Sequence, residues 1–431
     1  MRYLIFLAAF LYSNSLVIYN DFGFVKEDRD ISLREGINRV KYKEFPNSLV
    51  VDSIFIESDS NFTLLSTSFF PAKDFQKEIL SQNLNRVVSF YDKDKKLLKG
   101  VLRRIEPIVI EVNGKFYIVS SIDSIIFSLY KPKLASIELM VESKEELNST
   151  FTIDYLVDLI EWESRYVLNI EDNKSLALKN WALVKNSTNR DFKGFNIRLV
   201  AAEVNRVGQQ RVMVKRGVLR QESFSNQKSS SIHNYYYYDI GKRELLKNQT
   251  TLFLLNSAKG VRYRSYGVAK SRFIDFKGER ELRFDEIIEF NNSKSNGLGE
   301  PLSKGVIRVY RDGFYLGEDR VLNTPRGEIV KVRVGEIFDV IGKSRVVEFI
   351  NRAKYKFIKQ EYEIKNKKES SIEVRIVEEI PRYGNSIKFR SSCEGRICRV
   401  VGKKRGLKRE YIIKLEPNSQ YRFFTQYEIL Y

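Results

Sequence analysis

Four consecutive tyrosines, Tyr235 to Tyr238, follow closely on His233, the only histidine among the 431 residues. Side chains alternate between the two faces of a strand, so Tyr235 and Tyr237 would point one way and the other two rings the opposite way. An exposed row of such rings can stack on sugars or bases. The alternative is a strand with one face in the core and the other beneath a loop, which we favour because strands commonly take aromatic residues. Tyr235 and Tyr237 form the candidate aromatic face.

The sequence contains little else that is suited to catalysis. A Ser-His-Asp enzyme would have to use His233, whose neighbours supply no matching cluster of nucleophiles or metal ligands. The G-x-S-x-G, H-E-x-x-H and P-loop patterns are absent. Glu378 and Glu379 are a carboxylate pair, but neighbours in a strand face opposite ways. We therefore predict a protein that is not an enzyme and uses no cofactor or metal. The alternative is an enzyme acting on surface polysaccharide.

The only two cysteines, Cys393 and Cys398, flank a short segment that reads as a turn between strands. Such a turn brings two Cβ atoms within bonding range, so we predict a disulfide outside the reducing cytoplasm. Closing so small a loop adds about 2 kcal/mol of stability. The spacing is not that of a C-x-x-C redox pair, and a zinc site would lack ligands.

A run of basic residues follows the cysteines, and two glycines in it indicate an exposed loop. We predict that this loop contacts phosphate groups on lipid or polysaccharide, through Lys403, Lys404, Arg405, Lys408 and Arg409. Each basic residue near an anionic surface contributes about 1 kcal/mol at best. The alternative is a solvated loop without a partner.

The charge of the whole chain supports an anionic neighbour. The formal net charge is +19, and residues 341–431 hold 22 Lys and Arg against 11 Asp and Glu. Such a balance suggests an anionic lipid, an acidic polysaccharide or a nucleic acid. No nucleic-acid recognition pattern is present, so we expect an envelope component rather than nucleic acid. The alternative is solvated surface charge without a partner.

The N-terminus has the layout of a secretory signal peptide. One arginine precedes an apolar core, Tyr3 to Tyr12, and small polar residues follow it. Ten apolar residues are too few for an ordinary transmembrane span. We predict a signal peptide at residues 1–15, cleavage before Leu16, and export to the periplasm or cell surface. An uncleaved anchor is the alternative, and peripheral membrane association fits either case.

Short apolar runs rich in β-branched and aromatic residues, each closed by turn residues, predict an all-β fold with few short helices. Residues 72–84 are the best early helix candidate, with Phe75, Ile79 and Leu80 on one face. No tandem repeat of fixed period is visible. The expected division is a signal peptide at 1–15, a β segment at 16–68, a small β module with one helix at 69–146, a central β-sandwich at 147–345 and a basic immunoglobulin-like domain at 346–431.

Two blocks of the chain resemble a known family. The first runs from Asp154 to Asn205 and contains Trp162, Tyr166, and an N-x-(S/T)-x-x-D-(W/F) turn that begins at Asn186. The second, residues 301–340, contains L-G-E, T-P-x-G-E and G-x-x-F-D-V. Together they resemble the domain-of-unknown-function family 4139, which includes mucoidy inhibitor A-like proteins. The resemblance implies two or more sandwich-like units and a role in envelope biology, and it carries no catalytic residues.

The last strand candidate leaves a further alternative open. From Tyr421 to Tyr431, aromatic and apolar residues alternate with polar ones up to the end of the sequence. This pattern is also that of the closing strand of an outer-membrane β-barrel. The early helix, the long polar segments and the family resemblance favour sandwiches instead. We expect an exported envelope protein that binds or scaffolds an anionic component; the sequence does not reveal its oligomeric state.

Overall fold

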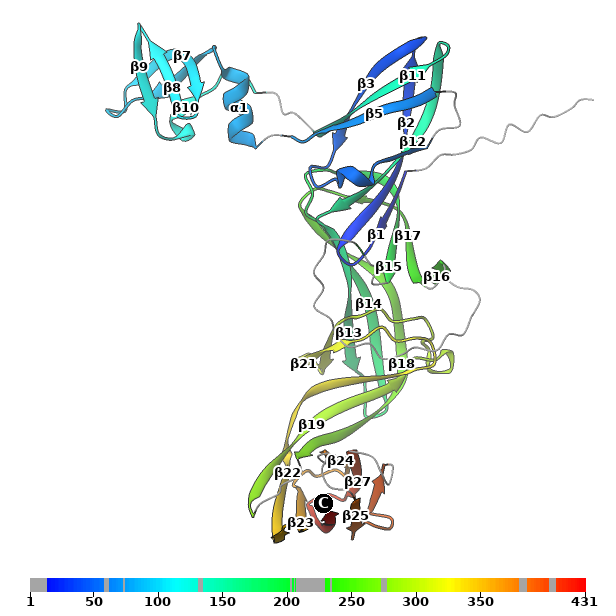
Figure 1. Cartoon of the computed structure of the whole chain (residues 1–431). Coiled ribbons are helices and arrows are strands. Elements are labelled where there is room, and N and C mark those ends of the chain that lie inside the picture. The colour runs from blue at the N-terminus through cyan, green and yellow to red at the C-terminus, as the bar shows by residue number, and fades with distance from the viewer. Residues whose placement is uncertain are drawn as a thin grey trace, which may run out of the picture. The chain divides into compact units, whose positions relative to one another are not determined.

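The computed structural model describes residues 14–57, 62–72, 74–130, 135–201, 204, 206, 229–232, 235–272, 277–379, 386–402 and 408–431 (Figure 1). Strands account for 71% of the structure and helices for 5%, so the predicted all-β, sandwich-type fold is confirmed. The described residues contain one α-helix, α1, and several open sheets.

The chain divides into two compact units. The first unit comprises Met1–Trp162, Val184–Gln209 and Asp239–Thr251, and the second comprises Glu163–Leu183, Gln210–Tyr238 and Leu252–Tyr431. Four strands, β13, β14, β17 and β18, therefore contribute residues to both. Their bounds are Ile160–Ile170, Ser175–Asn186, Tyr235–Leu245 and Gln249–Arg272.

A seven-stranded sheet has the order β16-β17-β15-β1-β2-β12-β4; β16 and the start of β17 fall in the second unit and its other strands in the first. Its strands β1, β2, β4, β12, β15 and β16 are Ser15–Ile18, Phe22–Leu33, Phe55–Glu57, Leu147–Asp158, Phe192–Ala201 and Ser229–Ile232. A second sheet has the order β3-β11-β5, with bounds Gly36–Phe45, Ala135–Ser143 and Phe62–Phe70. The short turn η1 (Val51–Ser53) precedes β4. Residues 135–143, which we grouped with the small module, thus belong to the sheet of β3 and β5.

The small module is a helix followed by a five-stranded sheet. Helix α1 (Phe75–Asn83) is capped by Asp74, whose carboxylate accepts hydrogen bonds from two backbone N–H groups of the first turn. Ile79 and Leu80 are buried as expected, whereas Phe75 in the first turn is exposed and its ring contacts that of Tyr130. The strand order is β10-β6-β7-β8-β9. Strands β6 to β10 are Val87–Tyr91, Leu97–Ile105, Ile108–Val112, Lys115–Val119 and Ile125–Ile126, with the turn η2 (Ile122–Ser124) before the last.

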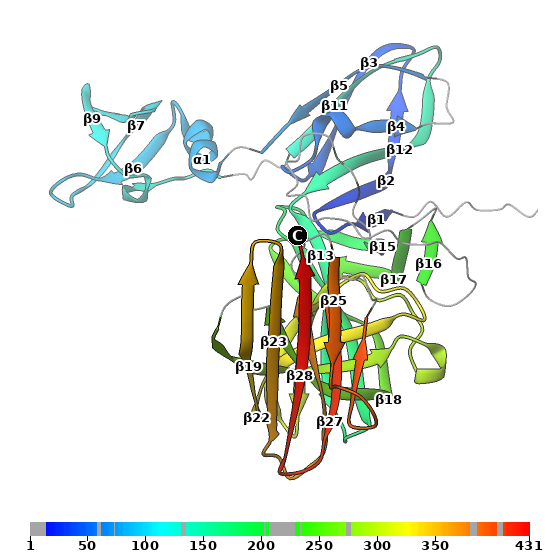
Figure 2. The same ribbon diagram turned by 60° about the horizontal axis from the view of Figure 1, so that its bottom comes forward.

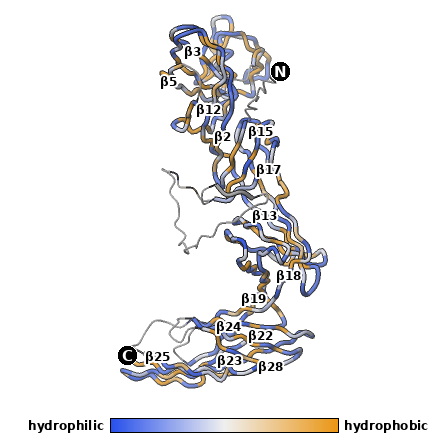
Figure 3. The backbone as a smooth tube through the Cα atoms, turned by 90° about the vertical axis from the view of Figure 1, so that its right-hand side faces the viewer, coloured by the Kyte–Doolittle hydropathy of each residue, from blue (hydrophilic) through white to orange (hydrophobic). Residues whose placement is uncertain are grey.

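The second unit is built on the order β21-β20-β13-β14-β18-β19-β22-β23-β28-β25, with β24, β26 and β27 beside this path. Figure 2 shows β22, β23, β28 and β25 in sequence across one sheet. Buried and exposed residues alternate along β23 and β28, so their apolar side chains lie on one face of the sheet. Figure 3 colours the backbone of these strands by hydropathy. The bounds of β19 to β28 are Glu279–Asn291, Gly305–Arg311, Phe314–Val321, Ile329–Arg352, Tyr355–Asn366, Ile372–Glu379, Ser386–Ser391, Cys398–Val401, Lys408–Leu415 and Ser419–Leu430. The turn η3 (Lys294–Asn296) follows β19.

One strand order occurs twice in the chain. The series β16-β17-β15-β1-β2-β12 is matched by β26-β27-β24-β18-β19-β22. In each series one neighbouring pair is parallel, β1 with β15 and β18 with β24. The order β13-β14-β18 is likewise matched by β22-β23-β28. The sequence shows no repeat of fixed period, yet the strand order repeats. The segments between matching strands differ in length, so the two copies have no common period.

A buried asparagine ends each of the matching strands β14 and β23, and bonds the turn that follows it to a later turn. We call this arrangement a corner. Asn186 donates hydrogen bonds to the carbonyl oxygens of Arg190, Leu245 and Leu246 at 2.9, 3.2 and 3.1 Å. Its own oxygen accepts from the backbone N–H of Thr188 at 3.1 Å. This side chain thereby joins two turns that lie far apart in the sequence.

Asn366 makes the equivalent contacts in the second unit. It donates to the carbonyl oxygens of Ser370 and Glu416 at 3.0 and 2.9 Å, and accepts from the backbone N–H of Lys368 at 3.1 Å. Both corners share a Lys-Asn pair, at 185–186 and 365–366. Only an amide supplies two donors and an acceptor in so small a side chain.

We expect Asn366→Ala to lower the free energy of unfolding by roughly 1–3 kcal/mol, because it leaves buried carbonyl oxygens without donors. The control is Asn351→Ala, which changes an exposed asparagine and should shift stability by less than about 0.5 kcal/mol. Urea unfolding of both variants measures the difference. Equal effects would show that the corner hydrogen bonds contribute no more than an average surface contact.

Candidate functional site

The cysteines form the predicted disulfide. Cys393 and Cys398 are bonded, with Cα atoms 5.0 Å apart, and both are buried in the core of the second unit beside Tyr411 and Ile413. Because solvent does not reach either sulfur, the bond contributes to packing and chain restraint.

The predicted basic contact is divided by the structure. Lys403, Lys404 and Arg405 lie outside the described residues. Lys408 is exposed and lies 2.8 Å from the carboxylate of Glu379. Arg409, in contrast, is only 6% exposed. The prediction of a surface contact was therefore wrong for Arg409: strand β27 begins at Lys408, so alternation turns the next side chain inward.

Arg409 belongs instead to a buried polar cluster around Glu378. Its guanidinium carbon lies 3.9 Å from the centre of the Phe389 ring, and its Nη1 lies 3.4 Å from the hydroxyl of Tyr427. The hydroxyls of Tyr362, Tyr411 and Tyr427 all donate to the carboxylate of Glu378, the first two at 2.9 and 2.5 Å.

Burial raises the pKa of Glu378 above its ordinary value, although the tyrosine hydrogen bonds and Arg409 oppose that shift. Glu378 is fully buried, whereas Glu379 is exposed on the opposite face of β24. The two carboxylates therefore face opposite sides of β24 and do not share a cleft. Strand alternation predicted this arrangement.

The first unit contains a buried ion pair. The guanidinium of Arg190 donates to both oxygens of Glu27, at 2.9 and 2.7 Å, and the hydroxyl of Tyr155 donates to the same carboxylate at 3.0 Å. Burial alone would raise the pKa of Glu27, but Arg190 outweighs it and holds that pKa below its ordinary value. Arg190 lies within the turn that begins at Asn186, which gives this segment a structural role.

The four tyrosines fall in β17 and divide between surface and core. Tyr238 is buried and donates from its hydroxyl to the carbonyl oxygen of Pro301 at 2.7 Å. Tyr235 and Tyr236 are each 39% exposed, and Tyr237 is half-buried. The proposed face of Tyr235 and Tyr237 is thus only partly open to a ligand. His233 lies outside the described residues.

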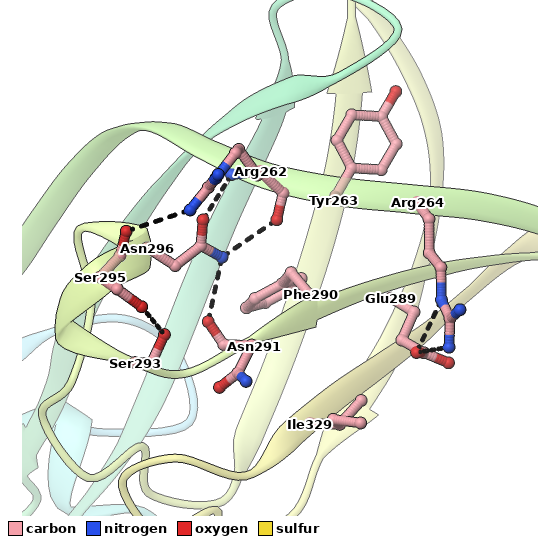
Figure 4. Close-up of a pocket in the computed structure, with 10 residues that line it drawn as sticks. All are labelled: Arg262, Tyr263, Arg264, Glu289, Phe290, Asn291, Ser293, Ser295, Asn296 and Ile329. Carbon is pink, nitrogen blue, oxygen red and sulfur yellow. Dashed lines mark hydrogen bonds and ion pairs between the residues drawn. The ribbon is translucent and has the colours of Figure 1, made fainter.

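The best candidate for a binding site is a surface hollow of about 390 Å³ in the second unit (Figure 4). It lies over β18 and β19, beside the turn η3 and the start of β22. Two arginines, one carboxylate, five side chains with amide or hydroxyl groups and two apolar side chains line it: Arg262, Tyr263, Arg264, Glu289, Phe290, Asn291, Ser293, Ser295, Asn296 and Ile329.

Asparagine side chains hold the loop beside the hollow in place. The amide of Asn296 donates to the carbonyl oxygens of Arg262 and Asn291 at 3.0 and 3.1 Å, and its oxygen accepts from the backbone N–H of Arg262 at 2.8 Å. Asn292 ties the far side of the same loop to Glu300 and Pro325. These hydrogen bonds hold the loop beside the hollow in one conformation, although the sequence of that loop suggests flexibility.

Positive charge exceeds negative charge around the hollow. Arg264 and Lys331 both pair with the carboxylate of Glu289, at 2.9 Å and 3.6 Å. Burial would raise the pKa of Glu289, but hydrogen bonds from Tyr266 and Arg264 hold it below its ordinary value, so this carboxylate is ionised. The guanidinium of Arg262 contacts the backbone oxygen of Ser295 at 3.4 Å rather than a carboxylate. Figure 4 shows Arg262 beside Ser295 and Asn296, and Arg264 beside Glu289.

Sequence reasoning did not identify these arginines as site residues. Arg262 and Arg264 occur in the segment VRYRSYGV, which reads simply as a strand. The usable signal was two arginines at spacing two, which places both on one face of a strand. The turn η3 also borders the hollow, and only the tertiary structure shows that it lies beside the two arginines.

Comparison with known proteins gives no match: no family model matches the chain, and no curated protein is significantly similar to it. Among the described residues, no helix has the length and apolar composition needed to cross a membrane. The same residues contain no group of three or more His, Cys, Asp or Glu side chains placed to hold a metal ion.

We expect alkaline pH to unfold the cluster around Glu378. Burial, together with the charge of Glu378, raises the pKa of Tyr362, Tyr411 and Tyr427 well above the ordinary value near 10. Below pH 10 both states hold these protons. Above it the unfolded state releases them first, so stability falls as pH rises. The phenolate absorbance of the three rings should appear only together with the unfolding signal.

A matched pair of variants tests this assignment. Tyr411→Phe removes one donor to a buried carboxylate and should cost about 1.5–3 kcal/mol at neutral pH. Tyr315→Phe, at an exposed ring, should change stability by less than about 0.5 kcal/mol. Phenolate absorbance that rises fully before any loss of folded signal would contradict the buried placement of the rings.

Proposed function

We propose that this chain is an exported, non-enzymatic β-sandwich protein of the cell envelope that binds an anionic polymer through the hollow beside Arg262. The observation that carries the proposal is the excess of charge there: Arg264 and Lys331 pair with the one ionised carboxylate, Glu289, while Arg262 at the other end of the hollow contacts a backbone oxygen. An excess of fixed positive charge in a concave surface attracts carboxylate, sulfate or phosphate groups.

The other groups at the rim favour an acidic polysaccharide among anionic polymers. Ser293, Ser295 and Asn291 offer hydroxyl and amide groups at the edge of the hollow, and such groups pair with sugar hydroxyls. Ile329 is an exposed apolar side chain on which the face of a sugar ring can rest. A guanidinium then pairs with a carboxylate of the polymer, which a neutral glucan would lack.

Export and family membership are parts of the same proposal. The signal-like segment at residues 1–15 supports export, but its first thirteen residues lie outside the described part of the chain. The sequence resemblance to family 4139 supports an envelope role. The basic run at Lys403, Lys404, Arg405 and Lys408 is proposed as a second contact to the same anionic component, with Arg409 removed from it.

We expect Arg262→Gln to weaken binding of a polyuronate about tenfold, because one charge-assisted contact is lost. The control, Arg280→Gln, removes the same charge from an exposed position outside the lining residues and should bind normally. Titration calorimetry of the full chain against polyuronate, polyphosphate, anionic vesicles and neutral glucan separates the sources of charge. Equal weakening by both variants would assign binding to net charge alone.

We further expect the native protein to begin at Leu16 and to leave washed envelopes in high salt, because screening weakens contacts between exposed charges. N-terminal sequencing of each fraction measures both points. Release only by detergent with Met1 retained would indicate an anchor. Recovery in the soluble fraction at low salt would contradict a charge-held envelope contact.

A further inference from the structure

The strand β9 of the five-stranded module in the first unit carries two exposed apolar side chains. The register places Phe116 and Ile118 of β9 opposite Glu111 and Val109 of β8, on the side of the sheet away from the core. Phe116 is 66% exposed and Ile118 is 70% exposed. The opposite face of the same sheet carries the buried residues Val88, Phe90, Leu102 and Ile110. Large apolar side chains so placed mark an interaction surface.

Strand β9 is also an edge of its sheet. In the described part of the chain it pairs with β8 alone. Asn113 and Gly114 both have positive φ, so they form the two-residue turn of a tight hairpin. The pair that flanks the turn, Val112 and Lys115, then exchanges backbone hydrogen bonds. Hydrogen-bonded pairs alternate along antiparallel strands, so Tyr117 also bonds to β8 through its backbone. The backbone N–H and C=O groups of Phe116 and Ile118 therefore point away from the sheet.

We propose that β9 of one chain pairs antiparallel with β9 of a second copy, with the two-fold axis at Tyr117. In this register each Phe116 lies opposite Ile118 of the partner, and the outward backbone groups of both residues form hydrogen bonds. Any shift of register loses some of these bonds, because only two residues of β9 present both groups outward. The two five-stranded sheets then become one continuous sheet.

The side chains of β9 fit this pairing with itself. Phe116 opposite Ile118 is an aromatic pair with a β-branched residue, which stabilises antiparallel strands. Lys115 lies opposite Val119 of the partner, so the two lysines do not face each other. The edge also lacks a proline or a bulge, the features by which edge strands commonly avoid pairing. A self-complementary strand of this kind favours a second copy over an unrelated partner.

Sedimentation of the full chain over a range of concentrations tests the pairing. We expect a reversible dimer. Ile118→Pro removes an outward N–H without touching the bonds to β8, and should raise the concentration of half-dissociation at least about tenfold. Ile118→Ser keeps that N–H and should have a smaller effect. Phe338→Ser changes a side chain that is 91% exposed in the second unit and should leave the dimer intact.

Cysteine crosslinking tests the register and does not depend on the proline variant. Phe116→Cys and Ile118→Cys chains are oxidised separately and after mixing. We expect a covalent dimer chiefly in the mixture, because position 116 faces position 118 and not itself. A monomeric wild-type chain at all concentrations, or equal crosslinking in the separate and mixed samples, would overturn the proposal. Loss of polyuronate binding in these variants is not expected, since the hollow lies in the other unit.

Discussion

Buried backbone carbonyl groups impose the constraint on which the rest of the structure depends. Long strands must reverse direction at the corners of each sandwich, where oxygens leave the ladder and still need donors. Asn186 and Asn366 provide those donors, each across two separate turns. Because each amide joins a hairpin to a later one, strands distant in sequence are held in one sheet order. The repetition of that order follows from the repetition of its corner.

Two buried carboxylates are held by partners within the same interior. Glu27 is neutralised by Arg190, and Glu378 is held by three tyrosine hydroxyls with Arg409 nearby. Removing one partner leaves a buried charge unpaired, and this costs more free energy than the intact pair contributes to stability. These networks therefore specify one packing arrangement more than they raise the free energy of unfolding.

Two places on the surface have groups available to bind a partner, and the groups differ in chemistry. At the hollow of the second unit two cations pair with one carboxylate and Arg262 contacts a backbone oxygen, which leaves charge available to an anionic ligand. At β9 of the first unit the backbone of an edge strand is available, with apolar side chains beside it. The first favours a flexible acidic polymer and the second favours another strand.

Much of the fold could be predicted from local pattern. Alternation indicated an all-β chain, the apolar face of residues 72–84 indicated the helix, and the spacing of Cys393 and Cys398 indicated their bond. The candidate site was harder. Arg409 was expected at the surface and is buried, because one residue of strand phase decides which side a side chain takes. Arg262 read as an ordinary strand residue, although it lies beside the hollow.

The sequence by itself determined the elements, since strand, turn and helix preferences act between near neighbours. Only the tertiary structure decided the sheet order, the repeated corner and the grouping of Arg262, Arg264, Glu289 and Lys331. These depend on contacts between strands β18, β19 and β22, which lie between Gln249 and Arg352 of the sequence. No local pattern encodes which strands become neighbours, because that choice rests on burying apolar faces and satisfying backbone groups across the whole unit.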